Sequence, residues 1–74
     1  MNPWAGWSKE KPTIRERKTQ KKQCFLGTKR SYPICTKGTN KVNQKGIWAA
    51  YVRARQYKNK TVARKAKKMI SLQN

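Results

Sequence analysis

The side chains with the clearest chemical potential in this 74-residue chain are two cysteines, Cys24 and Cys35, and two glutamates, Glu10 and Glu16. Histidine is absent, so the commonest general base and metal ligand is missing. Both glutamates stand among lysines and arginines, which favour the charged carboxylate and make it a poor proton donor. No glycine-rich turn ends in the Gly-Lys-Ser or Gly-Lys-Thr of a phosphate-binding loop. We therefore expect no catalytic residues, no cofactor and no enzymatic activity.

The two cysteines also make a poor metal site, because a tetrahedral zinc ion needs four ligands and they supply two. They stand at corresponding ends of two apolar clusters, Phe25-Leu26 and Tyr32 with Ile34, separated by a polar turn. This arrangement is compatible with a disulfide, which would stabilise the fold by roughly 2–3 kcal/mol on the chain-entropy model. In a reducing compartment the same cysteines would instead be buried thiols. The sequence leaves both alternatives open and predicts no metal.

The basic residues give the strongest functional signal. The chain has 20 Lys and Arg against 2 acidic residues, a net charge of +18, so its charged surface barely alternates in sign. Such a chain is expected to bind a polyanion, with phosphates of nucleic acid favoured over an acidic protein surface. The predominance of lysine suits contacts to phosphate better than readout of base edges. The candidate anion-binding residues are Arg53, Arg55, Arg64, Lys65, Lys67 and Lys68.

The composition limits what can position these residues. Only 35% of the residues are hydrophobic, which allows one small domain whose full order we expect to depend on a partner that neutralises its charge. No apolar run is long enough to cross a membrane.

Residues 1–22 are expected to form an extended basic arm. Pro3, Gly6 and Pro12 disfavour a stable helix in its first half. Trp4 and Trp7 are interpreted as anchors in a pocket on a neighbouring protein. An equally weighted alternative is that they cover the chain's own helices, and stacking on bases is a third.

Two further segments complete a mainly α fold. Residues 23–36 are predicted to form the Cys-bracketed loop or a short hairpin, with Pro33 at its edge. Residues 44–72 are predicted to form a pair of short amphipathic helices joined near Lys58-Asn59-Lys60.

The first of these helices should run from Gln44 to Tyr57, with Asn43 as its N-cap and Gly46 as its weak point. Asn59 or Thr61 should cap the second, which is expected to end near Leu72. Apolar stripes at helical spacing define the facing surfaces, and they consist of Ile47, Tyr51 and Ala54 in the first helix and Val62, Ala66, Met69 and Ile70 in the second.

Over residues 23–70 the chain resembles small basic proteins of large eukaryotic DNA viruses. The resemblance lies in Cys24-Phe-Leu, Tyr32-Pro-Ile-Cys35 and Gly46-Ile-Trp-Ala-Ala-Tyr-Val-Arg-Ala-Arg-Gln-Tyr57, a Cys-bracketed loop before an Ala/Arg-rich helical pair. Longer relatives carry further cysteines where this chain has Thr39-Asn-Lys-Val-Asn43, and their absence weakens any inference of a zinc site.

The resemblance implies a structural virion component, a minor capsid protein that lines the inner face of the shell. Its partners would be other capsid proteins, with packaged DNA held by non-specific phosphate contacts. The alternative is a small ribosomal protein, cytoplasmic or organellar, whose arm threads between helices of rRNA.

Overall fold

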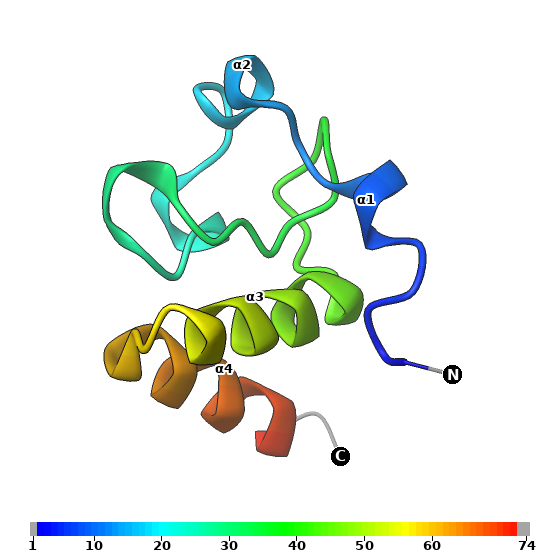
Figure 1. Ribbon diagram of the computed structural model, residues 1–74. Coiled ribbons are helices and arrows are strands. Elements are labelled where there is room, and N and C mark those ends of the chain that lie inside the picture. Colours follow the sequence, from blue (N-terminus) through cyan, green and yellow to red (C-terminus); the bar gives the residue numbers. More distant parts are fainter. Residues whose placement is uncertain (1, 73–74) are drawn as a thin grey trace.

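The computed structural model describes residues 2–72 and shows two layers (Figure 1). One layer is an antiparallel pair of helices, α3 (Gln44–Gln56) and α4 (Lys60–Leu72). The mainly α class, with a Cys-bracketed loop followed by two longer helices, is therefore confirmed. The other layer holds four single-turn elements, which are the α-helices α1 (Trp7–Glu10) and α2 (Ile14–Arg17) and the 3-10 helices η1 (Lys22–Cys24) and η2 (Thr28–Arg30).

The helical pair begins and turns as its capping residues predict. The side chain of Asn43 accepts a hydrogen bond from Lys45 N at 2.9 Å, and Asn59 Oδ1 accepts one from Val62 N at 3.1 Å. Between the helices Lys58 takes the left-handed conformation, with φ of 55°, and reverses the chain. Helix α3 ends at Gln56, one residue before the predicted end.

The apolar stripes of the two helices face the interior. Ile47 and Ala54 of α3 and Ala66 of α4 are fully buried. Ala50, which is not part of the predicted stripe, is also buried, because the other layer covers a second flank of α3. The core is therefore shared between the α3–α4 pair and the Cys-bracketed loop rather than enclosed by the two helices alone.

A disulfide joins Cys24 to Cys35, with a Cα–Cα distance of 5.2 Å, so the structure selects the first of the two alternatives for these residues. Both cysteines are completely buried. The loop between them is a short irregular hairpin in which Leu26 N donates to Tyr32 O at 3.1 Å. Ile34 N donates to Cys24 O at 2.8 Å, and Asn43 N donates to Ile34 O at 2.7 Å. The segment around Ile34 thus links the loop directly to the start of α3.

Gly46 explains how the arm packs onto α3. A Cβ atom at this position would lie 2.7 Å from Cη2 of Trp7 and 2.9 Å from Cα of Ile34. Only glycine leaves room for the indole ring and for the backbone of the Cys-bracketed loop at this point of the helix. The residue that helix propensity marks as the weak point is therefore the place where all three segments meet.

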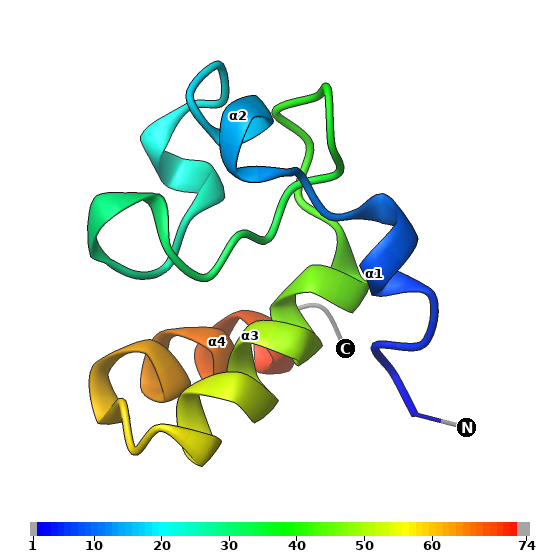
Figure 2. The same cartoon turned by 45° about the horizontal axis from the view of Figure 1, so that its top comes forward.

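The arm is folded back rather than free, as the turned view in Figure 2 shows, with α1 beside the start of α3. The expectation that proline and glycine exclude helix from its first half is wrong, because α1 forms one turn between Gly6 and Pro12. Gly6 permits this by taking φ of 87°, and Pro12 lies beyond the last helical residue. None of the helices formed by residues 2–72 is long and apolar enough to cross a bilayer.

Polar contacts fix the second half of the arm. Gln20 is only 4% exposed, and its amide nitrogen donates to the carbonyls of Thr36 and Thr39 at 3.0 and 2.7 Å. Arg17 and Arg30 each donate a side-chain hydrogen bond to the other's carbonyl, at 3.3 and 2.8 Å. These two arginines therefore join segments of the chain, and their side chains are only partly available to a ligand.

Candidate anion-binding cleft

Three of the six predicted anion-binding residues come together in one cleft between the end of α3 and the start of α4. Arg55 lies on its α3 side, and Arg64 and Lys67 lie on its α4 side. Lys58 and Lys60 of the connection also line it. All five side chains belong to residues exposed to solvent. We call these five residues and their surroundings the interhelical cleft.

The walls of the interhelical cleft leave its centre open. Ala54 and Ala63 lie between the charged residues, and their short side chains keep the helices close together without filling the space. Tyr51 supports one wall. Its ring centroid lies 5.7 Å from the guanidinium carbon of Arg55, and its hydroxyl accepts a hydrogen bond from Arg55 Nη1 at 3.4 Å. Arg55 is thus held at the cleft before any ligand arrives.

The connection between the helices also contributes positive charge to the interhelical cleft. Lys58 occupies a left-handed position that usually takes glycine, so its conformation costs free energy that a glycine would avoid. The first turn of α4 also lines the cleft, and the N-terminal end of a helix carries partial positive charge. The cleft therefore combines five full charges with the favourable end of a helix dipole.

The other predicted cations do not join this cleft. Arg53, two positions before Arg55 on the helix, lines a different hollow between α3 and the arm. Lys65 and Lys68 are exposed on α4 but line neither hollow. The six candidate residues therefore do not share one surface, because residues two apart on a helix are separated by about 200° around its axis.

Both carboxylates lie away from the interhelical cleft. Glu10 accepts a hydrogen bond from Lys45 Nζ at 2.6 Å and one from Asn43 Nδ2 at 3.1 Å, and it makes the only ion pair found within residues 2–72. Glu16 closes a capping box with Thr13 at the start of α2, through contacts of 2.9 and 3.2 Å. No acidic side chain is among the residues that line the cleft.

The same contacts govern how these carboxyls titrate. The hydrogen bond from Lys45, followed by that from Asn43, lowers the pKa of Glu10 below its ordinary value of 4.5. The backbone and side-chain hydrogen bonds from Thr13 lower the pKa of Glu16 in the same way. Both groups therefore stay negatively charged at neutral pH and are used up in internal contacts.

The two tryptophans occupy different environments. Trp7 is 7% exposed, with its ring against Gly46, so its side chain belongs to this chain's own interior. This corresponds to the alternative in which the tryptophans cover the helices, and the interpretation of Trp7 as an anchor for a neighbour is corrected accordingly. Trp4 is half-buried and lines the hollow beside α3, where it remains accessible to a partner.

Sequence reasoning missed Lys58 and Lys60 as members of the cleft. The signal available was their position in the short connection, where the ends of two antiparallel helices converge and any cation must lie near cations of both. Within the described part of the chain, no three side chains of His, Cys, Asp or Glu gather in a way that would hold a metal ion.

Comparison with known protein families finds no matching family model, and neither the curated proteins nor the solved structures searched include a match to this chain.

Proposed function

We propose that this protein is a non-enzymatic structural component of a viral particle, a minor capsid protein that binds packaged nucleic acid through the phosphates of its backbone. The observation that carries the binding part is the interhelical cleft, where five cationic residues meet with no carboxylate among them. Confined like charges repel one another, and a polyanion relieves that repulsion while releasing its own counterions. The assignment to a virus particle is supported by the resemblance over residues 23–70 and by the Trp4 side chain left accessible on the arm.

The contacts in the cleft favour backbone binding over sequence readout. Arg55 is held in place by the neighbouring Tyr51 side chain. The other four cations have long side chains exposed to solvent, with no such neighbour among residues 2–72 to fix them. Nothing in the cleft presents a fixed pair of donors and acceptors to a base edge. Binding is therefore expected to be independent of sequence and strongly dependent on salt.

The ribosomal alternative receives less support from the fold. It requires an arm that can extend between RNA helices, whereas this arm lies against α3 and the Cys-bracketed loop. The choice between a virion and a ribosomal subunit is tested by co-sedimentation, with this protein expected in purified particles and absent from ribosomal fractions.

The phosphate-binding part is tested by measuring affinity for a short DNA duplex over a series of salt concentrations. A ligand that engages all five cations should give a slope of log K against log salt of about −4.5. Replacing Arg55, Arg64 and Lys67 together by Gln should reduce the slope by about 3, since each lost phosphate contact removes about one unit.

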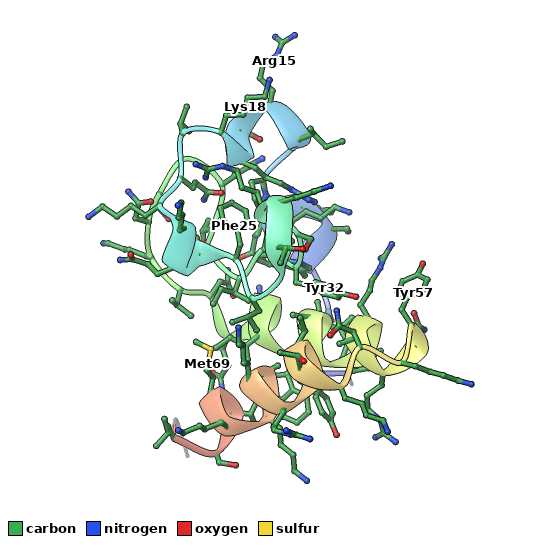
Figure 3. All side chains as sticks on the ribbon, turned by 90° about the vertical axis from the view of Figure 1, so that its left-hand side faces the viewer. Arg15, Lys18, Phe25, Tyr32, Tyr57 and Met69 are labelled. Atoms are coloured by element: carbon green, nitrogen blue, oxygen red, sulfur yellow. A yellow bond between two sulfur atoms is a disulfide. The ribbon has the colours of Figure 1, made fainter. Side chains whose placement is uncertain are left out.

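A matched control changes three cations outside the cleft. Arg15 and Lys18 point away from the helical pair at the far side of the molecule (Figure 3), and Lys22 follows in η1. The triple replacement of Arg15, Lys18 and Lys22 by Gln lowers the net charge equally but should change the slope by less than about 1. Equal effects of the two triple variants would show that total charge, rather than the interhelical cleft, governs binding.

A further inference from the structure

A second surface lies on the other flank of α3, and we call it the arm groove. Two adjoining hollows form it, and they share Trp7, Lys11, Ala49 and Arg53. Because they share four residues, the hollows are continuous along the helix. One end reaches Trp4 and Val52, and the other reaches Tyr57.

The chemistry of the arm groove differs from that of the interhelical cleft. On α3 its wall combines the aliphatic side chains of Ala49 and Val52 with the polar ones of Arg53 and Gln56. Tyr57 is 67% exposed at one end, an unusually open position for a large aromatic side chain. Figure 3 shows Tyr32 and Tyr57 on the same side of the molecule, and both line this part of the groove.

Cations stand along the apolar surface. Lys11 and Arg53 are exposed in the shared middle of the groove, and neither makes an ion pair within residues 2–72. No carboxylate is among the lining residues of either hollow. A ligand that fits should therefore offer both apolar groups and negative charge.

We propose that the arm groove binds a short, acidic protein segment that carries apolar side chains and is supplied by a neighbouring protein of the particle. The lining residues of α3 and its C-cap run from residue 49 to residue 57, a rise of about 12 Å at 1.5 Å per residue. An extended segment of about four residues spans that length at roughly 3.3 Å per residue. The particle is taken from the proposed function, but binding at this groove does not require that the cleft bind nucleic acid.

A protein segment fits these features better than nucleic acid does. Successive bases stack on open aromatic faces, but Trp4 and Tyr57 lie at opposite ends of the groove, and the ring between them, Trp7, is packed against Gly46 and 7% exposed. Three cations line the groove, against five at the interhelical cleft, and one of the three, Arg17, already donates a hydrogen bond to the carbonyl of Arg30. A surface that mixes apolar, polar and sparse cationic side chains matches a segment with both apolar and acidic side chains.

The test uses three synthetic peptides of equal length with the full chain. The probe alternates Asp and Leu, one control replaces each Leu by Ser, and the other replaces each Asp by Lys. Titrations followed by NMR should show the probe shifting the resonances of Trp4, Ala49 and Arg53, with both controls at least about tenfold weaker.

A matched pair of variants assigns the site. Arg53→Glu should weaken binding of the probe about tenfold, whereas Arg55→Glu on the opposite flank of α3 should change it less than about twofold. If the control peptide with Ser in place of Leu binds as tightly as the probe, binding depends on charge attraction alone, and the proposal is overturned. Stronger shifts of the same resonances by a single-stranded oligonucleotide would overturn it in favour of base stacking.

The two proposals fail separately. If neutralising the interhelical cleft leaves duplex binding unchanged, the proposed function is contradicted and this inference is not. If the probe does not bind at the arm groove while duplex binding is intact, this inference is contradicted and the proposed function is not.

Discussion

The two layers of this molecule are stabilised by different means. The α3–α4 pair follows a regular apolar pattern, with Ala54 and Ala66 fully buried between helices whose outer faces carry cations. Residues 2–43 have no such pattern, and they are held by the disulfide, by the buried amide of Gln20 and by the Glu10–Lys45 ion pair. The comparison shows that the two layers of this chain, which has little apolar content, are stabilised by different kinds of contact. One layer supplies specific contacts that complete the core, and the other keeps its charges free for a partner.

The largest expected effect on this division comes from Trp7. Trp7→Ala removes a nearly buried indole from the junction between the layers and should cost about 3–5 kcal/mol of unfolding free energy. Trp4→Ala is the matched control, because Trp4 is half-buried and should cost about 1 kcal/mol or less. Chemical denaturation measures both. Similar losses for the two variants would contradict the assignment of Trp7 to the interior and Trp4 to the surface.

The disulfide should come next. Replacing Cys24 and Cys35 together by Ala removes a link across 11 positions and should cost about 3 kcal/mol on the chain-entropy model. Hydrogen exchange should show the amides of residues 24–36 losing protection more than those of α4. Uniform loss throughout the chain would mean that the layers do not have separate sources of stability.

Gly46→Ala tests the point of contact between the layers. Helix propensity alone predicts that alanine stabilises α3 by about 1 kcal/mol. The added Cβ would instead lie 2.7 Å from the Trp7 ring and 2.9 Å from the Ile34 backbone, so the variant should lose about 1–3 kcal/mol.

Double-mutant analysis separates these contributions. In a Trp7→Ala background the cost of Gly46→Ala should shrink, because one of the two clashing groups is gone. A stabilising effect of Gly46→Ala in the native background would show that the indole does not pack at this position.

The smallest effect is expected from acid. The pKa values of Glu10 and Glu16 lie below 4.5 in the folded chain, so their contribution to stability is complete above the unfolded value and is lost as pH falls through the folded values. The thermal midpoint should therefore decrease on acidification below pH 4.5. Glu10→Gln should show a smaller decrease, and it should differ least from the native chain at the lowest pH. An unchanged profile would show that the Glu10 contacts do not stabilise the fold.

The helical pair was predictable because its signals are local. Asn43 and Asn59 are capping residues in positions that a sequence displays, and the spacing of Val62, Ala66 and Ile70 identifies the buried side of α4. These features depend on neighbours within one or two turns, so the bounds of both helices could be placed to within about one residue.

The layer formed by residues 2–43 was less predictable because its contacts join distant positions. A capping box at Thr13-Ile-Arg-Glu16 was a local signal for α2 that proline and glycine content obscured. Burial of Gln20, by contrast, depends on carbonyls sixteen and nineteen positions away, and no local pattern marks it. In a chain with 20 basic residues, Arg17 looks like any other cation until the fold places it against Arg30.

The candidate site shows the same limit. The sequence named Arg55, Arg64 and Lys67 together with Arg53 as candidates, but the structure places only the first three at the interhelical cleft. The separation of Arg53 from Arg55 follows from helix geometry together with the position of the arm, and only the structure gives the latter.

The most direct test of the account is an NMR titration of the isotopically labelled chain with a short DNA duplex at low salt. The account predicts that the largest shifts occur at Arg55, Lys58, Lys60, Arg64 and Lys67, with the disulfide-bonded loop unaffected. The claim that the interhelical cleft binds phosphate would be contradicted by shifts spread evenly over all the basic residues. It would also be contradicted by shifts concentrated at Arg15 and Lys18, which lie far from the helical pair.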